Sequence, residues 1–132
     1  MKKILVVEDD VPIGWLLERM LRGKHYVILM NNEQDALSWL SEGNSCDVII
    51  ADLSRQPGGC RVLLAALGRD PLLRNIPVIA LSASEESRCD CLQLGASAFV
   101  LKPLDLHQLL PEIKAKIEEL TDAVLVTALL KK

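Results

Sequence analysis

Residues 4–10 read ILVVEDD, and this stretch decides the fold. Four consecutive aliphatic side chains are typical of a strand that is buried on both faces, as in a parallel sheet covered by helices. Similar apolar runs stand at residues 26–30, 48–51, 78–81 and 98–101. Between the runs, apolar side chains recur at helical spacing, for example at Ile13, Leu17 and Leu21. Five alternating strand–helix units predict an α/β fold with a parallel sheet.

Residues typical of helix ends stand where the alternation of strands and helices requires them. Signals typical of helix N-termini stand at Asp10, Asn31–Asn32 and residues 84–86, and glycines follow predicted helices at positions 23, 43 and 95. Five units use residues 1–120, which we assign to one domain. We assign residues 121–132 to a C-terminal extension, which continues the last helix, forms a short extra element or begins a linker.

Composition limits the function. The 132 residues carry 15 basic and 18 acidic side chains, for a net charge of −3 at pH 7. This balance offers no basic face for nucleic acid, and the spacing of Cys89 and Cys91 does not suit a zinc knuckle. The apolar runs are too short to span a membrane, and the N-terminus lacks a secretory signal. We therefore expect a cytoplasmic protein that binds neither nucleic acid nor membrane.

Polar side chains follow the apolar runs directly. Glu8, Asp9 and Asp10 come after the first run, Asp52 after the third, Ser82 after the fourth and Lys102 after the fifth. Ligand sites of open α/β sheets lie beyond the carboxyl ends of the strands, so these groups are expected to converge. Clustered carboxylates need a cation, and their hard oxygen ligands suit Mg²⁺. With Lys102 and Ser82 available for phosphoryl oxygens, the set suits phosphoryl transfer to a carboxylate such as Asp52.

In this order, the residues resemble a known family. The segments Val7–Asp9, Asp52–Leu53, Ser82–Ala83 and Phe99–Pro103 are similar to the receiver domain of two-component response regulators, of which chemotaxis receivers are an example. The resemblance covers about residues 2 to 120. It implies a flavodoxin-like, doubly wound sheet of strand order 2-1-3-4-5.

The resemblance also implies a role for each matching residue. Asp52 would be the phosphoacceptor, and Lys102 would contact both its carboxylate and the phosphoryl group. Glu8 and Asp9, together with Asp52 and the backbone carbonyl of Ser54, would hold Mg²⁺.

Two further residues would form the conformational switch. Ser82 would turn toward the phosphoryl oxygen, while the ring of Phe99 moves inward. The phosphodonor would be a histidine kinase or a phosphotransfer protein carrying a phosphohistidine. The output would act on a partner protein or output domain through the fourth helix, fifth strand and fifth helix, a face that could also form a homodimer. Such a protein is a signalling switch and not an enzyme, since it catalyses only its own phosphorylation and dephosphorylation.

The loop after Asp52 departs from the family. Receivers often carry Met-Pro three residues after the phosphoacceptor, whereas here Arg55 stands at the Met position and Pro57 comes one place late. This departure keeps a second interpretation open, in which the chain is a degenerate receiver that binds proteins without phosphorylation. A flavin or nucleotide binder and an aspartate-dependent phosphatase are disfavoured, because the acidic turn at residues 8–10 suits neither.

Structural explanations exist for the same residues. The acids at positions 8–10 could serve only the dipole of the following helix, and Asp52 or Ser82 could be an ordinary cap. Lys102 could be a surface lysine before a proline, and Phe99 could simply fill the core. A structure separates these explanations from the site hypothesis, because only the latter requires the side chains to meet.

Overall fold

A computed structural model describes residues 2–52, 59–102 and 106–130 of the chain. Its five parallel strands lie in the order β2-β1-β3-β4-β5. They are β1 (Lys3–Val7), β2 (Tyr26–Met30), β3 (Val48–Asp52), β4 (Val78–Ser82) and β5 (Ala98–Leu101). Each predicted run therefore forms a strand, and the predicted flavodoxin-like fold and strand order are confirmed.

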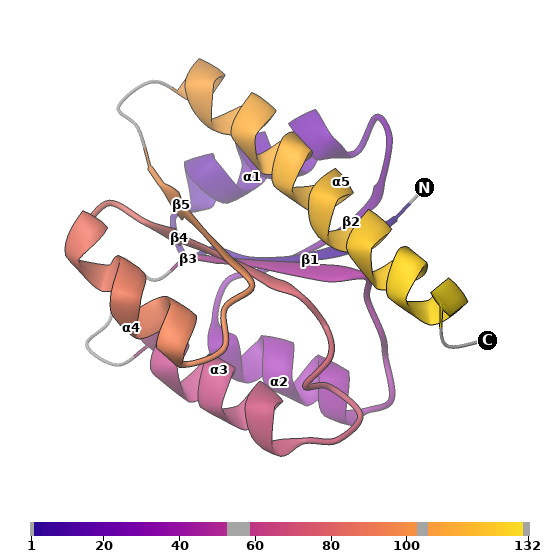
Figure 1. The fold of residues 1–132 in the computed structure, drawn as a ribbon. Helices are drawn as coiled ribbons and strands as arrows, with labels where there is room; N and C mark the ends of the chain where they lie inside the picture. The colour runs from indigo at the N-terminus through magenta and orange to yellow at the C-terminus, as the bar shows by residue number, and fades with distance from the viewer. Residues whose placement is uncertain (1, 53–58, 103–105, 131–132) are drawn as a thin grey trace.

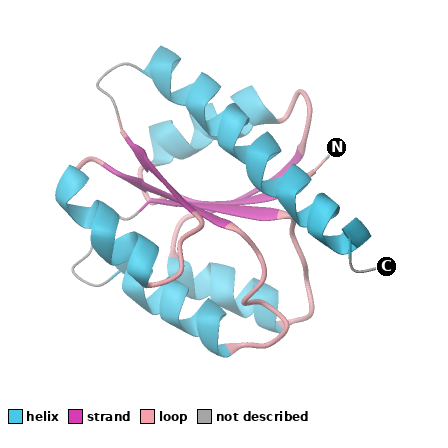
Figure 2. Cartoon of the chain, in the orientation of Figure 1, coloured by secondary structure: helices cyan, strands magenta, loops and turns pink. Residues whose placement is uncertain are grey.

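Helices cover both faces of the sheet (Figures 1 and 2). The helices α1 (Val11–Leu21) and α5 (Leu106–Leu130) lie on one face. On the other face lie α2 (Glu33–Ser41), α3 (Gly59–Arg69) and α4 (Arg88–Gln93). The helix α5 passes position 121 without a break, so the backbone of the extension follows the helical course up to Leu130.

The core consists of two apolar layers separated by the sheet. The layer under α1 and α5 contains Ile4, Val6 and Ile50 from the central strands, and the layer on the α2–α3–α4 side contains Leu5, Ile49 and Ala80. Alternate residues of one strand thus enter opposite layers, which explains why the strands read as continuous apolar runs.

Several predicted helix boundaries are visible as hydrogen bonds or backbone angles. The Asp10 side chain accepts the amide of Ile13 at 3.2 Å, and the Asn32 side chain accepts that of Asp35 at 2.8 Å. Gly43 and Gly95 adopt φ angles of +97° and +113°, which favour glycine. Ser84 differs from the prediction, because it makes no side-chain cap bond and is followed by a 3-10 turn, η1 (Glu85–Ser87).

Candidate phosphoacceptor site

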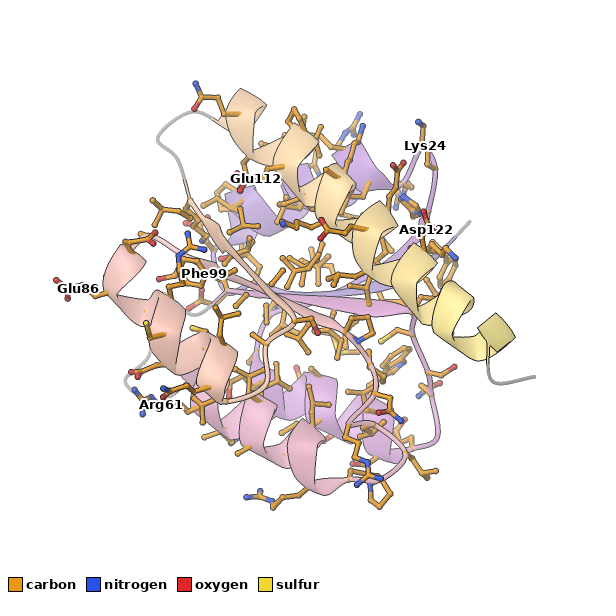
Figure 3. All side chains as sticks on the ribbon, viewed as in Figure 1. Lys24, Arg61, Glu86, Phe99, Glu112 and Asp122 are labelled. Carbon is orange, nitrogen blue, oxygen red and sulfur yellow. The ribbon has the colours of Figure 1, made fainter. Side chains whose placement is uncertain are left out.

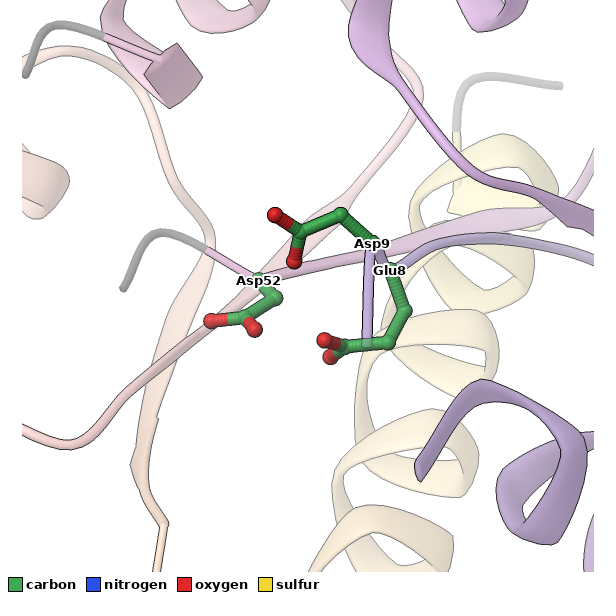
Figure 4. Close-up of side chains that lie close together, drawn as sticks. All are labelled: Glu8, Asp9 and Asp52. Carbon is green, nitrogen blue, oxygen red and sulfur yellow. The ribbon is translucent and has the colours of Figure 1, made fainter. Parts of the chain in front are cut away.

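Three carboxylates meet at the carboxyl end of the sheet. Glu8 and Asp9 follow β1, Asp52 is the last residue of β3, and one oxygen from each lies within 4.8 Å of the others (Figure 4). The strands bring them together because β1 and β3 are parallel neighbours, with Val7 opposite Ala51. Carboxylate oxygens at this spacing are suitable ligands for a hard divalent cation such as Mg²⁺.

Lys102 joins this cluster from the end of β5. Its Nζ lies 2.5 Å from Oδ2 of Asp52 and 3.3 Å from Oε2 of Glu8. The ammonium is therefore shared between two side chains that are almost fully buried, Asp52 at 3% and Glu8 at 1% exposure. Since Lys102 itself is 14% exposed, a surface role for this lysine is excluded.

Burial and proximity alter the ionisation of two of these groups. Burial, followed by a hydrogen bond with Asp52 and the negative charge of Asp52, raises the pKa of Glu8 to about 8, although Lys102 acts in the opposite direction. Burial alone would lower the pKa of Lys102, but the hydrogen bond to Asp52 and the charges of Asp52 and Glu8 raise it above its ordinary value. The site therefore favours a positive Lys102 and, without a metal, a protonated Glu8.

Ser82 lies next to the cluster in the sheet. It is the last residue of β4, which pairs with both β3 and β5, and it is 2% exposed. Its carbonyl accepts the amide of Lys102 at 2.8 Å, and its Oγ accepts the amide of Ser84 at 3.1 Å. The hydroxyl is thus held at the edge of the sheet where the carboxylates lie.

Phe99 is buried in β5, beside α4 (Figure 3). Its ring is 5% exposed and therefore already covered in this conformation. The guanidinium of Arg88 lies 4.7 Å from the ring centroid, and Arg88 also pairs with Glu85. The burial of Phe99 agrees with a residue that fills the core. The inward movement of its ring, which a switch residue would show, stays a prediction.

One predicted ligand and most of the atypical loop lie outside the described residues. The atypical loop runs from Ser54 to Cys60, and its residues 54–58 are not described, whereas Gly59 and Cys60 begin α3. The role of the Ser54 carbonyl in binding Mg²⁺ therefore stays a prediction. Asp10 is described, and its carboxylate caps α1, where it accepts the amide of Ile13. Of the three acids after β1, Glu8 and Asp9 join the cluster with Asp52.

Two contacts were not predicted from the sequence. Glu8 shares the Lys102 ammonium with Asp52, although the sequence suggested only metal binding for it. Arg88 stacks over Phe99 from a different element, and no spacing rule links residues 88 and 99. Both contacts depend on the directions of side chains in three dimensions, which the sequence does not give. For Glu8, the sequence indicated only its position at the end of a strand, through the apolar run before it.

Known proteins match this chain in sequence and in fold. The family model for the response regulator receiver domain matches residues 4–114. The PhoB phosphate regulon transcriptional regulatory protein of Escherichia coli is 32% identical over 124 residues, which make up 91% of this chain and 53% of PhoB. The transcriptional regulatory protein YbdJ of Bacillus subtilis is 34% identical over 118 residues, 88% of this chain and 51% of YbdJ. The chain thus spans about half the length of these curated relatives.

Solved structures of response regulators have the same fold as this chain. The phosphorylated cyanobacterial phytochrome response regulator RcpA superposes with a TM-score of 0.78 at 28% identity, covering 89% of this chain and 91% of RcpA. The response regulator TrrA of Thermotoga maritima, solved with Mg²⁺ and BeF, gives a TM-score of 0.71 at 27% identity over 89% of this chain and 99% of TrrA. This chain belongs to the response regulator receiver family.

A helix that crosses a membrane needs about 20 mostly apolar residues in a row. Within the part of the chain that the structure describes, no helix combines the length and the apolar character that crossing a bilayer requires.

Proposed function

We propose that this chain is a phosphoacceptor switch that receives a phosphoryl group on Asp52 from the phosphohistidine of a histidine kinase or phosphotransfer protein. The observation that carries the proposal is the buried Asp52 carboxylate, which lies between an ammonium and two further carboxylates. In the reaction, an oxygen of Asp52 attacks phosphorus, the phosphorus–nitrogen bond breaks, and the imidazole leaves with the bonding electrons. The product is an acyl phosphate on Asp52.

The carboxylates of Glu8, Asp9 and Asp52 fit a divalent cation, and we propose that they hold Mg²⁺. When bound, Mg²⁺ neutralises charge on the carboxylates and the incoming phosphoryl oxygens. The donor set supports this assignment, since three acids within 4.8 Å repel one another unless a cation compensates them.

Lys102 supplies the fixed positive charge of the site. Its Nζ already contacts Asp52 and is within reach of a phosphoryl oxygen attached to that residue, where it would balance the charge that develops. The ammonium is held by two buried partners, so little reorganisation is needed when the phosphoryl group arrives.

We propose that Ser82 and Phe99 transmit the change. The Ser82 hydroxyl would exchange its bond with the amide of Ser84 for one to a phosphoryl oxygen. That exchange would shift η1 and α4, to which Arg88 belongs, and thereby the packing over Phe99. Phosphorylation would thus bias two conformations that exist before the reaction.

The output would act through α4, β5 and α5 on a partner protein or domain, or on a second copy of the chain. Leu92 on α4 and Leu101 on β5 are 43% and 38% exposed, which supports an apolar contact surface on this face. In this proposal the chain turns over no separate substrate. A size measurement before and after phosphorylation tests the homodimer.

Mass spectrometry tests the phosphoacceptor directly. We expect the intact protein to gain one phosphoryl group when it is incubated with Mg²⁺ and acetyl phosphate, and we expect no gain in Asp52→Ala. The control is Asp47→Ala, which removes an exposed carboxylate outside the cluster. If the parent protein gained nothing while remaining folded, the phosphorylation-independent interaction module would be the better interpretation.

A further inference from the structure

The strand β2 ends the sheet, and one side of its backbone has no partner strand among the described residues. Tyr26 donates its amide to Lys2, and Met30 accepts the amide of Glu8. In a parallel ladder only alternate residues bond to a given neighbour, so Tyr26, Ile28 and Met30 face β1. Val27 and Leu29 therefore direct their N–H and C=O groups to the outer edge.

An open cavity of about 410 Å³ lies beside this edge. The end of β2, at residues 29–31, forms one side of it, and Asp35, Ser38, Trp39 and Glu42 form the other. The indole of Trp39 already attracts a cation, because Nζ of Lys3 lies 5.4 Å from its ring centroid. The cavity thus combines an aromatic wall with two carboxylates.

The charge of this region is strongly one-sided. Residues 31–47 contain four carboxylates, at Glu33, Asp35, Glu42 and Asp47, and no lysine or arginine. Lys3 of β1 is the cation that the structure brings to Trp39. A basic side chain that entered the cavity would meet the carboxylates of Asp35 and Glu42 beside Trp39, whose ring already has Lys3 over it, whereas an acidic side chain would be repelled by these carboxylates.

We propose that the outer edge of β2 and the adjoining Trp39 cavity form a docking site for an extended, basic segment of a partner protein. The segment would add a strand to the sheet by bonding to the main chain of Val27 and Leu29. A lysine or arginine of the segment would occupy the cavity. This site lies on a different element from Asp52 and does not depend on its phosphorylation.

An NMR titration with a blocked hexapeptide of alternating arginine and valine tests the proposal. We expect shifts centred on β2 and α2, with the amides of Val27 and Leu29 gaining protection from hydrogen exchange. The amides of Ile28 and Met30 already face β1 and should change little. Two probes serve as controls: a peptide with glutamate in place of arginine, and one with N-methylated backbone amides. Both should bind at least about fivefold more weakly.

A pair of charge-matched variants locates the site. Glu42→Lys should weaken binding of the arginine peptide by about fivefold. Asp122→Lys makes the same change of charge on α5, on the opposite face of the sheet (Figure 3), and should leave affinity unchanged.

Several outcomes overturn the proposal. These are equal binding of the glutamate peptide, shifts centred on another face, or no binding at millimolar peptide. Concentration-dependent self-association through β2 in sedimentation, without peptide binding, would instead assign the edge to a second copy of the chain.

Discussion

At the scale of single residues, the site depends on one lysine shared by two buried acids. Lys102 contacts Asp52 at 2.5 Å and Glu8 at 3.3 Å, and the side chains of both acids are almost fully buried. Burying such charges is unfavourable unless each has a partner. Removing the ammonium therefore affects both acids, so we expect this cluster to contribute to the stability of the fold.

The first prediction concerns Lys102→Ala. We expect the variant to fold but to lose about 2–4 kcal/mol of unfolding free energy at neutral pH without metal, because the buried Asp52 carboxylate loses its cation and Glu8 loses a hydrogen-bond donor. Urea denaturation measures the loss. Lys116→Ala is the control, since Lys116 pairs at 3.4 Å with the exposed Glu119 and should change stability by less than about 0.5 kcal/mol. Equal effects of the two substitutions would contradict the buried ion pair.

The second prediction concerns the pH dependence of stability. The pKa of Glu8 is raised from 4.5 to about 8, so the folded state holds this proton more tightly than the unfolded state. The contribution of the Glu8 proton to the unfolding free energy is fully present below pH 4.5 and is lost as the pH rises through about 8. The metal-free protein should therefore lose stability over this interval.

Glu8→Gln removes this titration. Urea denaturation at several pH values should give a smaller decline for the variant than for the parent. The exposed residue Glu112 provides the control: Glu112→Gln should leave the parent's profile unchanged. An identical decline in Glu8→Gln and parent would assign the pH dependence to other groups.

At the scale of elements, strand ends were predictable and side-chain contacts were not. The run at residues 4–7 located β1, and parallel pairing then placed Glu8, Asp9 and Asp52 at one edge, because it aligns the carboxyl ends of strands. The contact of Arg88 with Phe99 joins α4 to β5 through side-chain directions that no sequence period encodes. The cavity beside β2 was missed for the same reason.

Helix caps were partly predictable, and the third prediction tests one of them. Asn32 accepts the Asp35 amide at 2.8 Å at the start of α2. Asn32→Ala should cost about 1 kcal/mol of unfolding free energy, because an amide of the first turn loses its acceptor. Asn32→Ser restores an acceptor and should recover most of this loss. Equal stability of alanine and serine variants in urea denaturation would show that the cap contributes nothing.

At the scale of the whole molecule, the site exists only when the sheet is complete. Its groups come from the ends of β1, β3, β4 and β5, which are joined laterally in the order that the sheet defines. Residues more than 90 positions apart, such as Glu8 and Lys102, meet only after all four strands have paired. A ligand of this site must therefore bind the folded state and not the unfolded chain.

This dependence gives the fourth prediction, which concerns Mg²⁺. A ligand that binds only the folded state raises the unfolding free energy, by about 2.7 kcal/mol at a concentration one hundred times its dissociation constant. Thermal unfolding should therefore shift upward with Mg²⁺ concentration in the parent protein. The shift should be much smaller in Asp9→Asn, which removes an exposed carboxylate of the cluster. Asp122→Asn, on α5, should respond to Mg²⁺ like the parent. An equal shift in Asp9→Asn would place the stabilising ion elsewhere on the molecule.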